Sequence, residues 1–82
     1  SSGDDPVPQA TRSFYIDLPT DYGEILRVVV VDSQEKTVYE GEYNVNLDAS
    51  TEEITVTGTG QETFTIYING HYYSRIPVNF EG

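Results

Sequence analysis

Apolar and polar residues alternate along most of this chain, and a period of two is typical of a β-strand with one buried face. The alternation begins in Ser13–Leu18 and recurs in Thr37–Tyr43 and Thr63–Ile68. Glu24–Asp32 carries four consecutive valines, which disfavour a helix by restricting χ1 and predict a strand buried on both faces. Turn-rich stretches, PTDYG and GTGQE, separate the runs.

The remaining segments complete an all-β pattern. Ile54–Thr57 and Tyr72–Phe80 are further strands, Asn44–Leu47 either continues the preceding strand or begins a short one, and Ser33–Lys36 and Asp48–Glu53 are loops. No window has helical periodicity. Six or seven short strands, with turn signals about every 8–12 residues, predict an immunoglobulin-like antiparallel β-sandwich. The chain has no cysteine, so this sandwich would have no disulfide.

The length of 82 residues fits one domain. Residues 1–12 contain proline, glycine and aspartate and little to bury, which predicts a disordered acidic tether, although Ser1–Gly3 equally fits a cloning remnant. Residues 13–82 are expected to form the sandwich. No apolar stretch reaches the roughly 18 residues of a membrane span and no signal peptide is present, which fits a cytosolic protein or a mature form without its leader.

The segment TFTIYINGHYYSRIPVNF, residues 63–80, predicts a hairpin, because Asn-Gly between alternating strands is the signature of a tight turn. A plain two-residue turn would pair Ile66 with Tyr73 and place Arg75 on the core face. A one-residue slip exchanges the two faces of a strand. We therefore predict a three-residue loop, or a bulge beside Gly70, and no direct pairing of Ile66 with Tyr73.

This register also predicts which tyrosines face solvent. Tyr72 would point at least partly inward, whereas Tyr67 and Tyr73 would point outward. Exposed aromatic residues can mark an interaction site, but tyrosines on strands also serve as cross-strand packing. Together with Tyr43 they are the candidate ligand-binding residues. Pro77 has no N–H and should lie at an edge, at a bulge or where the strand changes partner.

Charge narrows the range of partners. Fourteen acidic residues stand against four basic ones, which gives a formal net charge of −10. Such a surface repels phosphate backbones and anionic lipid, so nucleic-acid binding is not expected. The same charge keeps a small domain soluble, and we expect a monomer. Partners should be neutral, cationic or bridged by a cation.

The residues do not indicate an enzyme. His71 is the one histidine, and its place at the hairpin tip is typical of a polar turn residue. Ser74 and Asp32 could in principle complete a triad, but no nucleophile elbow or oxyanion-hole motif accompanies them. Paired acids such as Glu40 and Glu42 fit a solvated strand face better than a glycosidase cleft. We expect no catalytic residue.

One loop has the donor set of a hard cation. Asp48, Ser50, Glu52 and Glu53 all supply oxygen atoms suited to calcium. The loop lacks the EF-hand pattern and its glycine. Calcium bound there is the one cofactor that the sequence suggests.

Two segments carry a family resemblance: ILRVVVVDSQEKTVYEGEY and ETFTIYINGHYYSRIPVNF, which together span roughly Ile25 to Phe80. They resemble the small immunoglobulin-like domain family of unknown function found in exported lipoproteins of Bacteroidetes bacteria. Glu35 stands where that family usually has a loop glycine, and Arg75 stands near another. The resemblance implies the cell envelope or surface as location, a lipid anchor on a cysteine outside this chain, and no catalytic residues.

Three functions are compatible with these observations. The first is a non-catalytic envelope module for binding, adhesion or spacing, with an unknown protein or glycan ligand. The second is a small carbohydrate-binding module that uses Tyr67, Tyr73 and Tyr43 as a stacking platform. The third is a structural domain that exchanges or accepts a strand at an exposed edge.

Overall fold

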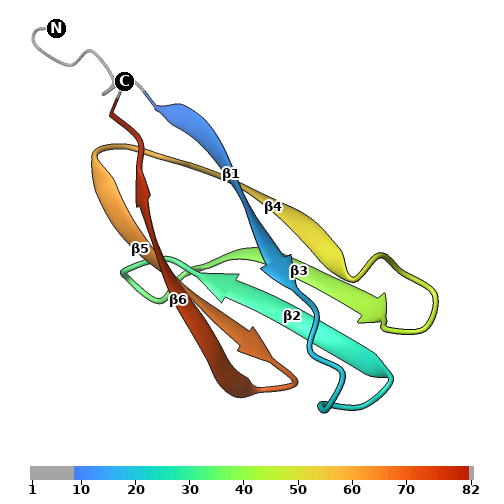
Figure 1. Ribbon diagram of the computed structural model, residues 1–82. Helices are drawn as coiled ribbons and strands as arrows, with labels where there is room; N and C mark the ends of the chain where they lie inside the picture. Colours follow the sequence, from blue (N-terminus) through green and yellow to red (C-terminus); the bar gives the residue numbers. More distant parts are fainter. Residues whose placement is uncertain (1–8, 82) are drawn as a thin grey trace, which may run out of the picture.

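Six antiparallel strands form the chain in the computed structural model, which describes residues 9–81 (Figure 1). They are β1 (Ala10–Asp17), β2 (Ile25–Val31), β3 (Thr37–Asn44), β4 (Thr51–Gly58), β5 (Gln61–Ile68) and β6 (His71–Asn79). β1 pairs with β4 in one sheet, and the other sheet has the order β3-β2-β5-β6. The predicted all-β sandwich is confirmed. Residues 9–81 include no helix that is long and apolar enough to cross a membrane.

The strand order is that of an immunoglobulin sandwich. In that fold strands B and E are neighbours in one sheet, and C′, C, F and G form the other. β1 and β4 occupy the places of B and E, while β3, β2, β5 and β6 occupy those of C′, C, F and G. Within residues 9–81 no strand occupies the places of A and D, which flank B and E. The two-stranded sheet therefore has two free edges.

The core lies between the two central strands and the smaller sheet. Alternate residues of β2 and β5 point inward, and six of them are at most 1 % exposed: Leu26, Val28, Val30, Phe64, Ile66 and Ile68. Ile54 and Val56 of β4 cover them from the other sheet, and Phe80 packs edge-to-face on Phe64 at 6.0 Å. Val29 and Val31 lie on the outer face and are half-buried. The prediction that the valine strand is buried on both faces is wrong for that outer face.

The β5–β6 hairpin has a two-residue Asn-Gly turn with positive φ at both positions, followed by a bulge. Near the turn, Tyr67 pairs with Tyr72; beyond the bulge, Ile66 pairs with Ser74. Tyr73 is the extra residue between these two pairs. The predicted bulge is confirmed, and Ile66 does not pair with Tyr73. The position of the bulge differs from the prediction, because the extra residue is Tyr73 and does not lie beside Gly70.

That difference exchanges the two neighbouring tyrosines. Tyr72 points outward and is 56 % exposed, whereas Tyr73 is half-buried and packs edge-to-face on Tyr22 at 6.2 Å. The Tyr73 hydroxyl donates a hydrogen bond to the Asp17 carbonyl oxygen at 2.9 Å. The predictions that Tyr72 faces inward and Tyr73 outward are therefore wrong. Pro77 lies on β6, an edge strand, as predicted.

Some element boundaries also differ from the prediction. β1 begins at Ala10, so residues 10–12, which the sequence assigned to the tether, belong to the sandwich. Val45–Leu47 form a turn that follows β3 and do not form a strand. Thr51–Glu53 belong to β4, because they pair with β1. The predicted disorder of residues 1–8 lies outside the described residues.

Candidate binding face

The outer face of the four-stranded sheet carries two adjoining hollows, each of about 480 Å³. They share Ser33 and Thr63, so together they form one shallow groove that runs along β5 and β6 beside the end of β2. We call it the outer-face groove. Its lining residues are Val31, Asp32, Ser33, Glu35, Gln61, Glu62, Thr63, Thr65, Tyr67, Arg75, Pro77, Val78 and Asn79.

Strand alternation places most of these side chains on the outer face, whereas Glu62 and Val78 belong by alternation to the other face and border the groove at its end. Thr63, Thr65 and Tyr67 are every second residue of β5, opposite the buried Phe64 and Ile66. On β6, the bulge restores the same alternation, so that Arg75 lies opposite Thr65 and Pro77 opposite Thr63. The result is a row of hydroxyl groups beside a tyrosine ring and a guanidinium group.

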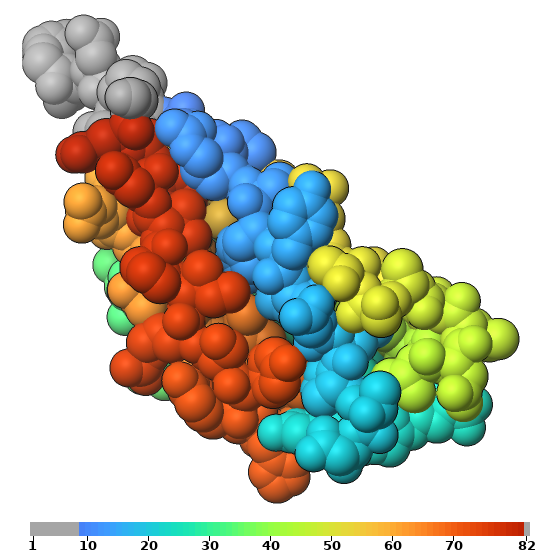
Figure 2. Space-filling model, in the orientation of Figure 1, coloured from blue at the N-terminus to red at the C-terminus, as the bar shows by residue number. Residues whose placement is uncertain are grey.

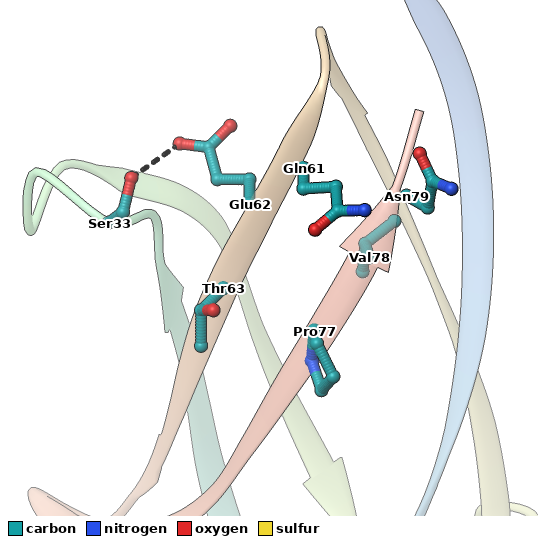
Figure 3. A pocket seen from close by; sticks show the side chains of 7 residues that line it. All are labelled: Ser33, Gln61, Glu62, Thr63, Pro77, Val78 and Asn79. Carbon is teal, nitrogen blue, oxygen red and sulfur yellow. Dashed lines mark hydrogen bonds between the residues drawn. The ribbon is translucent and has the colours of Figure 1, made fainter. Parts of the chain in front are cut away.

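Several polar groups of the groove already have partners. The Asp32 carboxylate accepts hydrogen bonds from the Gln34 and Lys36 amides at 2.8 and 2.9 Å, which fixes the β2–β3 turn. Ser33 donates to Glu62 at 2.9 Å, and Figure 3 shows Glu62 extending from β5 towards that serine. These contacts hold the rim of the groove in place.

At the other end of the groove, the Arg75 guanidinium lies 5.9 Å from the centre of the exposed Tyr72 ring. Tyr72 pairs across the strands with Tyr67. Two tyrosines and one arginine therefore gather on the outer face near the hairpin tip. Figure 3 shows the opposite end, where Gln61 extends towards Val78 and Asn79.

Of the three tyrosines selected from the sequence, only Tyr67 lines this groove. Tyr73 packs into the other side of the sheet. Tyr43 is half-buried on β3, where its hydroxyl is hydrogen-bonded to the Tyr39 hydroxyl. Burial, that hydrogen bond and nearby negative charge, including that of Glu52, raise the pKa of Tyr43. The three tyrosines do not form a common platform, because the bulge and β3 direct two of them inward.

The predicted calcium ligands are dispersed. Glu52 and Glu53 are consecutive residues of β4 and so point to opposite faces of the sheet. The Asp48 carboxylate accepts a hydrogen bond from the Asn44 amide at 2.7 Å, closing a turn, and Ser50 joins the β1–β4 ladder. Within residues 9–81 no three histidine, cysteine or acidic side chains are grouped so that they could hold a metal ion. The loop that was expected to gather them is partly a strand.

His71 lies at the exposed hairpin tip, as expected for a turn residue. With Asp21, Tyr22 and Asn69 it lines a third, more open hollow of about 430 Å³. Thr63, Thr65 and Arg75 line the groove but were not among the binding residues predicted from the sequence. The sequence feature that could have indicated them is the alternation of polar and apolar residues in the last two strands. Its apolar positions predicted the core, and its polar positions line the groove.

The chain matches no family model, and the comparisons with curated proteins and with solved structures give no match either.

Proposed function

We propose that this chain is a non-catalytic binding domain whose outer-face groove takes a neutral glycan. The main support for this proposal is that the two hollows are continuous. Tyr67 and Arg75 lie at one end, Gln61 and Asn79 lie at the other, and threonines lie between them. The location in a bacterial cell envelope rests on the sequence resemblance alone and is part of the proposal.

A sugar chain matches the chemistry of this groove. Its hydroxyls both donate and accept hydrogen bonds, as do the threonine hydroxyls and the Gln61 and Asn79 carboxamides. Its C–H faces are apolar and pack on an aromatic ring, and Tyr67 provides one that is half-buried and so held in a fixed position. An open groove along the outer face of a sheet suits a chain that enters and leaves at both ends.

Charge favours a neutral ligand. Asp32, Glu35 and Glu62 line the groove against one cation, Arg75, and the whole chain carries a net charge of −10. An anionic polysaccharide would therefore meet a repulsive field. A cationic ligand would be attracted to most of this surface without being oriented by the groove.

The test uses affinity electrophoresis through gels that contain soluble neutral polysaccharides: xyloglucan, galactomannan, mixed-linkage β-glucan and starch. We expect at least one polysaccharide to retard the wild-type protein and Tyr15→Ala, but not Tyr67→Ala. Tyr15 is the matched control, because it is 67 % exposed on the outer face of the other sheet. Circular dichroism checks that each variant is folded.

Retardation of the wild type by none of the four polysaccharides would argue against the proposal. Retardation that survives in Tyr67→Ala would move the binding site away from the groove, and the proposal would be wrong. Gels that contain excess calcium are compared with gels that contain a chelator, which tests separately whether binding depends on the predicted calcium ion.

A further inference from the structure

A second surface lies on the β1 side of the sandwich and has only Val78 in common with the groove. β1 and β6 lie beside each other along one side of the sandwich, each at the edge of its own sheet (Figure 1, Figure 2). An immunoglobulin sandwich has strand A beside strand B, the place that β1 occupies here. Within residues 9–81 nothing pairs with that edge.

The hydrogen-bond pattern shows which backbone groups this edge presents. The Leu18 amide donates to the Ser50 carbonyl at 2.8 Å, which extends the β1–β4 ladder by one pair. In an antiparallel ladder, bonded and non-bonded pairs alternate. Phe14 and Ile16 therefore bond to β4, whereas the backbone groups of Ser13 and Tyr15 point away from it.

The Tyr73 hydroxyl agrees with this assignment, because it reaches the Asp17 carbonyl from the β6 side. The Tyr73 side chain therefore occupies the Asp17 end of the β1 edge. Among residues 9–81, the exposed Arg12 side chain alone donates a hydrogen bond to the Thr11 carbonyl. The accessible edge is thus Thr11–Tyr15, long enough for a short added strand.

Inward-facing apolar residues are less covered along this side. Phe14 of β1 and Ile76 and Val78 of β6 are half-buried, in contrast to the fully buried residues of β2 and β5. The Phe14 ring lies 6.4 Å from that of Phe64, whose cross-strand neighbour is Ile76. A strand added to β1 would therefore place alternate side chains over this apolar seam.

The other free edges in residues 9–81 carry features that oppose strand addition. By the same alternation, β3 presents Glu40 and Glu42, and β4 presents Glu53 between Thr51 and Thr55. β6 presents Pro77, because the Phe80 amide bonds to the Gly60 carbonyl and sets the alternation there. Charges and proline are common protection against edge-to-edge pairing. Between Thr11 and Tyr15 the β1 edge has neither proline nor an acidic residue.

We propose that the β1 edge accepts an extended strand from a different protein, with alternating apolar residues and neutral or basic flanks. Main-chain hydrogen bonds to Ser13 and Tyr15 would hold it, as in other cases of β-strand addition. The net charge of −10 favours such a partner over a second copy of this chain, which would carry the same charge.

The probe is a capped peptide of about seven residues that alternates valine and threonine and has a lysine at each end. Amide hydrogen exchange of the full chain is measured by NMR with and without it. We expect exchange at Ser13 and Tyr15 to slow by about tenfold or more at saturation, with no change at Glu40 and Glu42 on the β3 edge. A peptide N-methylated on its pairing side is the control and should have no effect.

Two proline variants provide a matched pair. Ser13 and Thr55 face each other across the β1–β4 ladder and share a hydrogen bond between their hydroxyls at 3.0 Å. Ser13→Pro and Thr55→Pro both remove that bond and both place proline at a free edge, but only Ser13→Pro blocks β1. Peptide binding should be lost in the first variant and kept in the second.

Protection by the N-methylated peptide, or no protection by either peptide, would overturn the proposal, and neither result needs a variant to fold. Sedimentation without peptide tests the other occupants. A wild-type dimer that Ser13→Pro converts to a monomer would identify a second copy at this edge, and the proposal of a different protein would be wrong.

Discussion

Asn69 connects the hairpin tip to the rest of the sheet, and its replacement tests that connection. Its side-chain oxygen accepts a hydrogen bond from the Arg27 amide at 2.8 Å. Its side-chain nitrogen donates to the Tyr22 and Ile25 carbonyls at 3.1 and 3.2 Å. The side chain therefore continues the β2–β5 pairing beyond the last strand residue. Asn69 also has φ +53°, a conformation that asparagine and glycine adopt more readily than alanine.

The expected loss can be worked out from these contacts. Asn69 is exposed, so each of its three side-chain bonds competes with water and contributes about 0.5 kcal/mol. The left-handed backbone costs alanine about 1 kcal/mol more. Asn69→Ala should therefore lower the free energy of unfolding by about 2.5 kcal/mol, and Asn69→Gly by about 1.5 kcal/mol. A chain of 82 residues has a total stability of about 4–12 kcal/mol, so either loss is large.

Urea unfolding followed by tyrosine fluorescence measures both values. With an m-value of about 1 kcal/mol per molar urea, the midpoint should fall by about 2.5 M for alanine and about 1.5 M for glycine. Asn46→Ala is the control, because Asn46 lies in an exposed turn and its side chain has no hydrogen bond to any of residues 9–81. It should change stability by less than about 0.5 kcal/mol. Equal effects of Asn69→Ala and Asn46→Ala would refute the role of these bonds; equal effects of alanine and glycine at 69 would refute the backbone argument.

Three further predictions concern strain and ionisation. A Cβ at Gly58 would lie 2.8 Å from the Phe80 ring, so Gly58→Ala should cost about 1–3 kcal/mol in urea unfolding, and no loss would show that the ring is free to move. Glu35 has φ +63°, so Glu35→Gly should increase the free energy of unfolding by about 0.5–1 kcal/mol and thereby raise the melting temperature. A lower melting temperature would contradict this. The raised pKa of Tyr43 means that the fold favours its neutral form, so its contribution is complete below about pH 10 and lost as the pH rises further. Tyr43→Phe should flatten that alkaline loss in unfolding curves measured across pH, and an unchanged profile would contradict the assignment.

The strands could be predicted from the sequence because each sheet of a two-layer sandwich buries one face, which makes apolar and polar residues alternate along each strand. Phe64, Ile66 and Ile68 show it on β5, and the need to keep Arg75 off the core predicted a bulge. The strand ends were less accurate, since the β1–β4 pairing that extends β1 to Ala10 joins segments distant in the chain.

The position of the bulge could not be derived, because it depends on a contact from outside the hairpin. Tyr73 turns inward where Tyr22 and the Asp17 carbonyl meet it, and neither residue is near it in the sequence. A bulge anywhere between the turn and Ser74 satisfies the pattern of the core. The choice between Tyr72 and Tyr73 as the exposed residue is thus a tertiary effect, and it decides which tyrosine stands beside Tyr67.

The same reasoning explains why the groove and the β1 edge were missed. Each is a surface only because, in the folded structure, no other element of residues 9–81 packs over it. The polar alternation of Thr63, Thr65 and Tyr67 is equally that of a simple solvated face, and it becomes a groove only where Ser33 and its turn rise beside it. The β1 edge is notable only after the alternation of the ladder shows that β3, β4 and β6 carry acids or proline at equivalent positions. The groove belongs to the four-stranded sheet and the β1 edge to the other sheet, and only Val78 borders both, so Tyr67 variants and Ser13 variants test the two proposals separately on the same protein.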